Sequence, residues 1–137
     1  MTQQEIDRLI DAHFEYERND DITGVLSTLT EDVVHDVVGW PFGPVQGPEK
    51  AKVFYEQLFA DLEGTVIHPV RRLYGDDFAV DESQVETIAV GSPFGYEGRG
   101  RRLSFRLLHI FNFRDGLIER ENVWIDLAAI RQQLESN

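Results

Sequence analysis

The clearest fold signal is RRLSFRLLHIFNFRDGLIERENVWI, residues 101–125, in which two runs of alternating apolar and polar residues flank one turn. Alternation with period two is typical of β-strands that bury one face. The pattern predicts strands over Arg101–Arg114 and Leu117–Ile125. Asp115-Gly116 between them favours a type I′ hairpin turn, because both central residues of that turn have a positive φ. We therefore expect an antiparallel pair here.

Two more strands are predicted upstream, over Thr65–Tyr74 and Phe78–Val90, so four long strands form a meander. The first half of the chain has helical spacing instead, starting with a Thr2/Glu5 capping box and a helix over residues 3 to 17. The other expected elements are a short helix capped by Asp21 with Ile22, Val25, Leu26 and Leu29 on its inner face, a strand over Asp32–Val38, a helix starting at Gly47-Pro48-Glu49 and a closing helix over Leu127–Leu134. Together they predict one α+β domain over residues 1–137, with a curved antiparallel sheet wrapped around helices.

Acidic side chains outnumber basic ones, with 25 Asp and Glu against 13 Lys and Arg and a formal net charge of −12. Repulsion from phosphates and anionic lipids argues against a protein that binds nucleic acid or a membrane surface. The chain has no cysteine, which excludes disulfides, thiolate metal ligands and thiol nucleophiles. The first residues lack a signal-peptide pattern, and no apolar run approaches about 18 residues, so we expect a cytoplasmic protein.

His109 interrupts the apolar face of the strand predicted over Arg101–Arg114, between Leu107 and Phe111. A histidine in an apolar environment loses its charged form more easily and can act near neutral pH as a hydrogen-bond donor or a base. The structural alternative is a neutral histidine bonded to one backbone carbonyl. The pattern makes His109 a candidate catalytic residue.

Two more histidines occupy positions that are expected to face the interior. His13 belongs to the inward stripe of the first helix, seven residues after Ile6. The alternative for His13 is a boundary position at the end of that helix. His35 shares a strand face with Val33 and Val37, and the opposite strand parity would direct it to solvent.

Three carboxylates are candidates for proton transfer. Glu82 continues the face of Phe78 and Val80, and a carboxylate beside apolar walls has the raised pKa that suits acid/base chemistry near pH 7. The alternative for Glu82 is a solvated bend. Glu121 either faces the interior or belongs to the charged outer face of the hairpin, and Asp126 is expected to be the N-cap of the last helix.

Aromatic side chains complete the predicted pocket. Tyr55 on the third helix is expected to direct its hydroxyl to the pocket, the alternative being a core role with the hydroxyl bonded elsewhere. Trp40 and Phe42, in a loop rich in Gly and Pro, are expected to form an apolar rim. A metal site made of the three pocket histidines and Glu82 is chemically conceivable, but no tight ligand spacing is present, so no metal is expected.

The order of the expected elements and three short motifs resemble the nuclear transport factor 2-like superfamily, and within it the SnoaL-like and ketosteroid-isomerase-like branch. The motifs are Gly47-Pro48-Glu49, Phe113-Arg114-Asp115-Gly116-Leu117-Ile118, and Asp126 followed by Leu-Ala-Ala-Ile-Arg-Gln-Gln-Leu. The resemblance implies a cone-shaped, cystatin-like fold whose sheet curls around a deep pocket. It also implies a homodimer packed sheet to sheet.

The resemblance assigns roles by position as well. The supporting tyrosine of the isomerases matches Tyr55, and their protonated aspartate falls on His109, which also matches the strand histidine of the polyketide cyclases. The cyclase acid of the last strand falls two positions after Glu121, on the same face. The general-base aspartate of the isomerases falls on Val37 or Trp40, neither of which can accept a proton from carbon.

These features predict a cofactor-free enzyme that moves a proton on a small apolar carbonyl or hydroxyl compound, as an isomerase, cyclase or dehydratase does. His109 and Tyr55 would polarise the substrate oxygen, and Glu82 or His35 would exchange the proton. The residues expected to line the ligand site are His13, Val37, Trp40, Phe78, Val80, Leu107 and Glu121. The alternative is a non-catalytic module of the same fold that binds a small hydrophobic molecule or forms a dimer.

Overall fold

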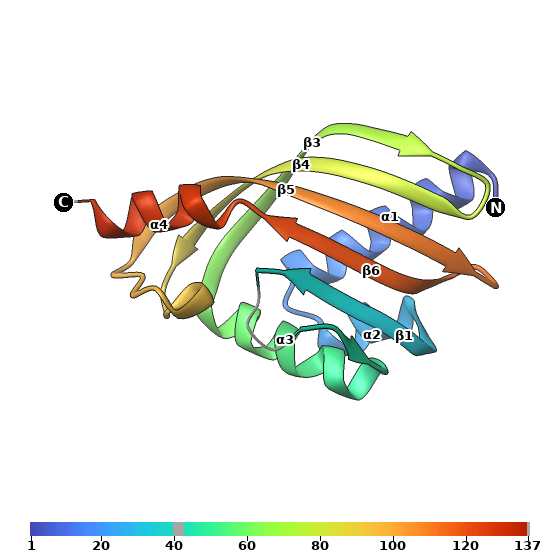
Figure 1. The fold of residues 1–137 in the computed structure, drawn as a ribbon, viewed down its shortest axis with the longest axis horizontal. Coiled ribbons are helices and arrows are strands. Elements are labelled where there is room, and N and C mark those ends of the chain that lie inside the picture. The colour runs from blue at the N-terminus through green and yellow to red at the C-terminus, as the bar shows by residue number, and fades with distance from the viewer. Residues whose placement is uncertain (40–42, 137) are drawn as a thin grey trace.

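The computed structural model describes residues 1–39 and 43–136, and in these residues one curved, unclosed sheet carries helices against one face (Figure 1). The elements are α1 (Gln3–Arg18), α2 (Ile22–Ser27), β1 (Leu29–Val38), β2 (Val45–Gln46), α3 (Pro48–Asp61), β3 (Leu62–Tyr74), β4 (Phe78–Ala89), a 3-10 turn (Pro93–Gly95), β5 (Arg101–Arg114), β6 (Leu117–Ile125) and α4 (Leu127–Glu135). The predicted α+β class is confirmed.

The strands lie in the order β2-β1-β6-β5-β4-β3. The meander β3 to β6 is antiparallel throughout, as predicted, while β1 pairs with β6 in parallel. The strand β6 therefore lies between β1 and β5. A residue of β6 on the inner face is therefore flanked by side chains of β1 and β5, two strands that are distant from each other in sequence.

Two strand starts lie three residues before the predicted ones, and one short strand was not predicted. The strand β1 begins at Leu29 rather than Asp32, because Leu29 pairs with Ile118 of β6 and so belongs to the sheet rather than to the face of α2. The strand β3 begins at Leu62, directly after α3, rather than at Thr65. The two-residue strand β2 was not predicted, because only pairing with β1 distinguishes it from the surrounding turn residues. Trp40 and Phe42 lie outside the described residues.

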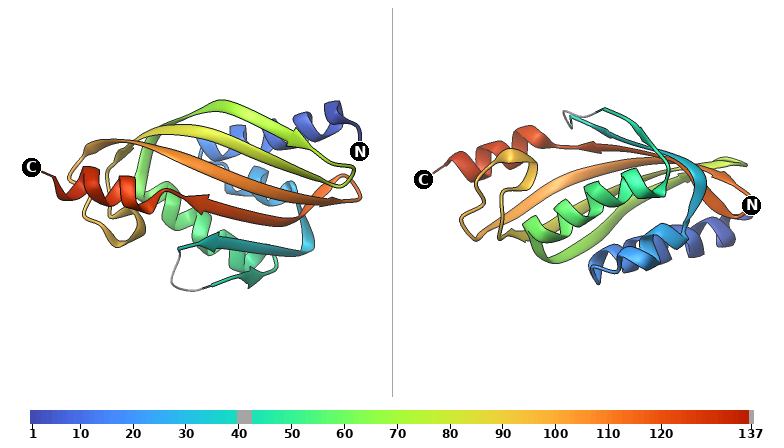
Figure 2. Two further views of the ribbon diagram at one scale, coloured as in Figure 1. Left: turned by 45° about the horizontal axis from the view of Figure 1, so that its top comes forward. Right: turned by 90° about the horizontal axis from the view of Figure 1, so that it is seen from below.

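Helices α1, α2 and α3 lie on the same side of the sheet, and α4 lies at the C-terminal end (Figure 2). Side-chain caps begin three of them: the capping box of Thr2 and Glu5 at α1, Asp21 at α2 and Asp126 at α4, all as predicted. The inward residues Ile6 and Ile10 of α1 are fully buried against the sheet. At the other end, buried residues of α4 pack on the sheet and enlarge the core.

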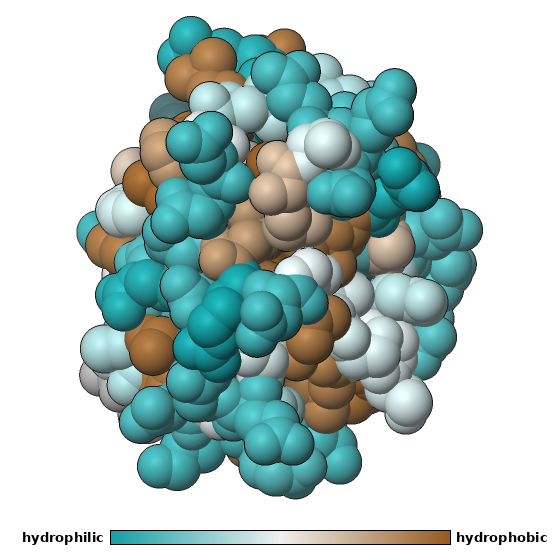
Figure 3. Space-filling view, turned by 90° about the vertical axis from the view of Figure 1, so that its right-hand side faces the viewer, coloured by the Kyte–Doolittle hydropathy of each residue, from teal (hydrophilic) through white to brown (hydrophobic). Residues whose placement is uncertain are grey.

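The end of the molecule that carries the N-terminus exposes mainly hydrophilic side chains, with apolar groups set among them (Figure 3). Within residues 1–39 and 43–136, no helix combines the length and the apolar character needed to cross a membrane.

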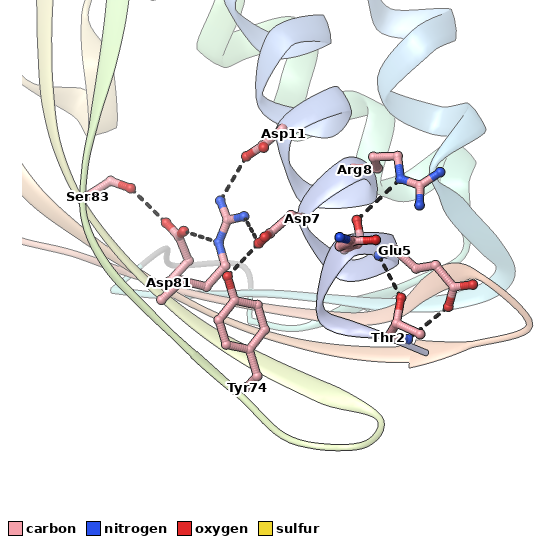
Figure 4. A network of polar contacts seen from close by, with 10 residues as sticks. Thr2, Glu5, Asp7, Arg8, Asp11, Tyr74, Asp81 and Ser83 are labelled. Carbon is pink, nitrogen blue, oxygen red and sulfur yellow. Dashed lines mark hydrogen bonds and ion pairs between the residues drawn. The ribbon is translucent and has the colours of Figure 1, made fainter.

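An arginine joins α1 to the edge of the sheet, and its partners Asp7, Asp11 and Asp81 are labelled in Figure 4. The Arg72 guanidinium of β3 donates to Asp81 of β4 at 2.8 Å, and to Asp7 and Asp11 of α1 at 2.7 and 3.0 Å. The Tyr74 hydroxyl also donates to Asp7, at 2.5 Å. Several charge-assisted hydrogen bonds from one planar group fix the position of α1 relative to the strands.

Candidate functional site

The sheet register brings three polar side chains together on the face covered by helices. Glu121 of β6 pairs with His35 of β1 on one side and with Phe111 of β5 on the other. His109 lies two residues before Phe111 and therefore shares its face. His35 is 2% exposed, Glu121 is 1% exposed and His109 is 2% exposed, so all three lie inside the protein.

Helices α1 and α3 add His13 and Tyr55 to this group, which we term the Glu121 cluster: His13, His35, Tyr55, His109 and Glu121. Oxygen Oε1 of Glu121 lies 3.3 Å from Nε2 of His13 and 3.3 Å from Nε2 of His109. Oxygen Oε2 accepts a 2.6 Å hydrogen bond from the Tyr55 hydroxyl and lies 3.8 Å from Nε2 of His35. One buried carboxylate is thus surrounded by three imidazoles and a phenol.

The protonation of His13 follows from its neighbours. The Thr28 hydroxyl donates its proton to the Val25 carbonyl at 2.6 Å, so it accepts a hydrogen bond from Nδ1 of His13 at 2.8 Å. Nε2 of His13 faces Glu121 and, at 3.5 Å, Glu17. Burial alone would lower the pKa of His13, but the two carboxylates raise it to about 10. His13 is therefore an imidazolium at neutral pH, and it compensates the charge of Glu121.

The other members of the cluster are fixed by the same carboxylate. Burial alone would raise the pKa of Glu121, but the charge of His13 and the hydrogen bonds from His109 and His13 hold it well below its ordinary value. Burial and Glu121 raise the pKa of Tyr55 well above its ordinary value, so the phenol keeps its proton and donates it. Burial lowers the pKa of His35, which favours the neutral ring.

His109 has one ring nitrogen in use and one without a partner. Its Nε2 makes a hydrogen bond with the Glu121 carboxylate, which can only accept, so Nε2 carries the proton. Its Nδ1 is buried and has no hydrogen-bond partner. The ring stacks on Phe111 with 4.9 Å between centroids and contacts Phe14 at 5.2 Å, so its orientation is fixed. The unshared electron pair on Nδ1 therefore has no partner within the described residues.

A cavity of about 70 Å³ adjoins Glu121 and His109. Its other walls are mostly apolar and comprise Phe54, Leu58, Phe59, Leu62, Ile67, Val85, Phe94, Phe105, Leu107, Val123 and Ile125, with Glu17, Asp20 and Thr65 as further polar groups. Since a cavity of about 150 Å³ holds benzene, this one suits a group of a few heavy atoms. Phe54 and Phe94 also line a second hollow of about 450 Å³, which contains His35 and Val37.

The expected orientation of Glu82 is wrong. In β4 the buried residues alternate from Ala79 through Asp81, so Phe78, Val80 and Glu82 lie on the outer face and line neither hollow. Glu82 instead forms ion pairs with Arg71 at 3.1 Å and Arg106 at 2.8 Å. The pairing of β4 with β5 shows which face is buried. Asp81 lies opposite the buried His109, and directly paired residues share a face, so Asp81 faces inward and its neighbour Glu82 faces outward. Glu82 therefore cannot exchange a proton with a ligand in the cavity.

The remaining candidates are buried or line a hollow. Leu107 lines the cavity, Val37 lines the second hollow, and His13 is fully buried rather than at a helix boundary. Tyr55 directs its hydroxyl at Glu121, so it positions the carboxylate instead of contacting a ligand. Sequence reasoning missed Glu17, although its spacing of four residues from His13 on α1 was a usable signal.

Three groups have the spacing of metal ligands: ligand atoms of His13, Glu17 and Glu121 lie within 4.8 Å of one another. With His13 in its imidazolium form, the nitrogen that faces both carboxylates carries a proton and has no electron pair for a metal. The absence of a resident metal stays a prediction.

The sequence matches the family model described as SnoaL-like domain over residues 10–121. The chain belongs to the SnoaL-like family. This domain therefore lies within the nuclear transport factor 2-like superfamily, as the resemblance implied. None of the curated proteins is significantly similar to the SnoaL-like chain in sequence.

Solved structures support the same fold for this SnoaL-like domain. TsrD from Streptomyces laurentii is 20% identical with a TM-score of 0.86, over 100% of this chain and 99% of that one. A putative polyketide cyclase from Xanthomonas campestris is 20% identical with a TM-score of 0.86, over 97% and 98% of the two chains. An epoxide hydrolase from M. tuberculosis described as LEH-like is 18% identical with a TM-score of 0.74, over 96% and 90%. The chain thus shares its fold with proteins described as a putative polyketide cyclase and an epoxide hydrolase.

Proposed function

We propose that this SnoaL-like domain is an acid/base enzyme that acts on a small, largely apolar molecule in the cavity beside His109. The observation that carries the proposal is the buried pair of His109 and Glu121, in which one ring nitrogen is bonded to the carboxylate and the other has no partner. Burying such groups costs free energy, and a buried carboxylate with a perturbed pKa beside a cavity, as Glu121 is, is typical of functional sites.

His109 is the proton acceptor in this proposal. A proton of the substrate, from a carbon next to a carbonyl or from a hydroxyl, moves to Nδ1 of His109, and the electron pair of the broken bond stays on the substrate. Glu121 stabilises the resulting imidazolium through Nε2–H. The imidazolium then returns the proton to another atom of the substrate, which completes an isomerisation, a cyclisation or an elimination.

Two other residues position the pair. Tyr55 holds Glu121 through its 2.6 Å hydrogen bond. His13 supplies a fixed positive charge at 3.3 Å, which keeps Glu121 ionised inside the protein. The apolar walls exclude water, so these fixed charges act more strongly than they would in solvent.

Hydrogen–deuterium exchange at carbon tests the proposal without knowledge of the natural substrate. A panel of small apolar ketones and hydroxyketones is incubated with the protein in D₂O, and deuterium incorporation, cyclisation and loss of water are followed by mass spectrometry. We expect one or more compounds to react, and His109→Gln to lower that rate by about 100-fold, as for loss of a general base. Glu82→Gln, on the outer face, is the matched control and retains the rate.

The outcomes of this assay separate the two functional hypotheses. An unchanged rate in His109→Gln would remove the catalytic role of His109. Binding of panel compounds, seen as shifts of the His109 ring signals, without exchange or conversion would favour the non-catalytic binding module.

We further propose that two copies associate through the outer face of the sheet. Trp124 of β6, Leu73 of β3 and Phe78 of β4 are exposed apolar residues, at 36%, 51% and 41%. The half-buried Leu108 pairs with Trp124 on the same face. Exposed apolar patches of this kind are typical of association surfaces.

The oligomeric state gives a further testable expectation. One chain has a mass of 15.8 kDa, so light scattering is expected to give 2 × 15.8 = 31.6 kDa for the wild type. Trp124→Lys introduces a charge into the proposed contact and is expected to give 15.8 kDa. Arg131→Lys on α4, which keeps the charge of an exposed residue paired with Glu135 on its own helix, is the control. A monomeric wild type contradicts the proposed dimer.

A further inference from the structure

The charged side chains in the cavity wall are mainly acidic. Three carboxylates line it, those of Glu17, Asp20 and Glu121, and among the described residues no lysine or arginine does. Glu121 is compensated by His13, which lies against it. Glu17 lies 3.5 Å from the same imidazolium, so one positive charge is shared by two carboxylates, and Glu17 and Asp20 together leave the cavity lining with a net negative charge.

These two acids mark the way into the cavity. Asp20 is the exposed member of its lining, and Glu17 has a side chain that is 13% exposed, whereas the neighbouring Glu121 is buried. Partial burial raises the pKa of Asp20, and the nearby carboxylate of Glu63 raises it further. The mouth of the cavity is therefore negative while its walls are apolar.

The helix α1 adds to this negative potential. Glu17 belongs to the last turn of α1 and Asp20 follows its C-cap, Asn19. The C-terminal end of a helix carries a partial negative charge, which stabilises a cation within about one turn. The net charge of −12 attracts cations and repels anions over longer distances as well.

The basic side chains nearby do not reverse this charge in the cavity. Arg18 follows Glu17 but lines a different hollow, between α1 and β3, together with Arg72. Lys50 lines the second hollow, and Phe54 and Phe94 contribute to the walls of both spaces. A carboxylate or phosphate entering the cavity would meet only acidic groups at its mouth.

A second feature also indicates a ligand here. His109, 2% exposed, lines the same cavity and has a buried Nδ1 without a hydrogen-bond partner. A buried polar atom without a partner costs free energy unless a ligand or water satisfies it. The cavity thus has apolar walls, acidic groups at its entrance and, in its lining residue His109, a buried acceptor without a partner.

We propose that the ligand of this cavity is an apolar molecule that carries a basic nitrogen, whose ammonium group binds at the mouth beside Glu17 and Asp20. This inference deepens the proposed function and rests on the cavity being its substrate site. An apolar carboxylic acid of the same shape is rejected, because no cation compensates it there. A neutral alcohol fits but lacks the charge-assisted hydrogen bond.

Three matched probes on one short skeleton test the proposal: isobutylamine, isobutanol and isobutyrate, each titrated into the protein while the His109 ring and backbone amide signals are followed by NMR. We expect isobutylamine to bind about tenfold more tightly than isobutanol, as for one charge-assisted hydrogen bond, and isobutyrate to bind most weakly. Isobutanol that binds as tightly as isobutylamine overturns the proposal.

A pair of double variants separates the local acids from the general negative charge. Glu17→Gln with Asp20→Asn is expected to abolish the preference for isobutylamine and to leave the affinity for isobutanol within about twofold. Glu15→Gln with Glu97→Gln removes the same charge from exposed positions that do not line the cavity, and retains the preference. Equal loss in both variants overturns the proposal.

Failure of the proposed function is distinguishable from failure of this inference. The protein could prefer isobutylamine, lose that preference in the Glu17 and Asp20 double variant, and still exchange no deuterium into any panel compound. That result would support the proposed ligand class and contradict only the proposed catalysis.

Discussion

Glu121→Gln is expected to destabilise the protein by about 3 kcal/mol, because it leaves the His13 imidazolium buried without its main counter-charge. The substitution keeps the size of the side chain and an acceptor oxygen for Tyr55, so the effect arises from charge. We also expect the pKa of His13 to fall below about 10, since one of the two carboxylates that raise it is lost. Urea denaturation measures the first effect and NMR titration of the ring the second.

The pH dependence provides an internal check on this expectation. The pKa of His13 is raised by folding, so its stabilising contribution is complete below the ordinary value of 6.5 and is lost as the pH rises through about 10. The pKa of Glu121 is lowered, so its contribution is present above 4.5 and is lost as the pH falls. The wild type should therefore lose stability between pH 7 and pH 10, and Glu121→Gln should lose less.

Glu119→Gln is the matched control for this variant. Glu119 lies on the same strand, two residues earlier, and pairs with Arg114 at 3.1 Å on the surface. Its replacement is expected to cost less than about 1 kcal/mol. Equal stability of the Glu121 and Glu119 variants would contradict the assignment of a buried ion pair.

Arg72→Met is expected to be the second large effect, with a loss of about 3 kcal/mol, because Asp81 is 1% exposed and loses its cation. The methionine keeps much of the apolar stem of Arg72. The free aspartates of α1 also lose their connection to β3, so amide protons of α1 are expected to exchange faster with solvent. Thermal denaturation and hydrogen exchange measure the two effects.

Arg71→Met is the adjacent control. The Arg71 side chain is 68% exposed and pairs with Glu82 at 3.1 Å. An exposed pair contributes about 0 to 1 kcal/mol, so this variant should remain close to the wild type. A loss as large as that of Arg72→Met would mean that the Arg72 network adds nothing beyond surface charge.

The sequence predicted the fold wherever local pattern and final structure agree. Strict alternation from Leu103 to Phe113 places His109 inside, because a single polar residue in an apolar stripe shares its face. Caps such as Asp21 and Asp126 act within four residues and need no tertiary information. These features were therefore predicted correctly.

Features that depend on pairing between distant strands were predicted less well. On β4, apolar residues occur on both faces of the strand. Phe78 and Val80 therefore suggested the wrong inner face, and Glu82, which shares their face, was assigned to the interior as well. Glu121 lies in a charged run, and its burial depends on His13, which is 108 positions away. Only the assembled structure shows that these two charges compensate each other.

The tautomer of His109 is the most direct test of the central claim, that Glu121 fixes this ring so that its second nitrogen faces a ligand. Nitrogen-15 NMR of histidine-labelled protein at neutral pH distinguishes the two ring nitrogens. We expect a protonated Nε2 and an unprotonated Nδ1, with the Nδ1 signal moving when isobutylamine is added. A proton on Nδ1 with an unprotonated Nε2, or an Nδ1 signal unaffected by every cavity ligand, would contradict it.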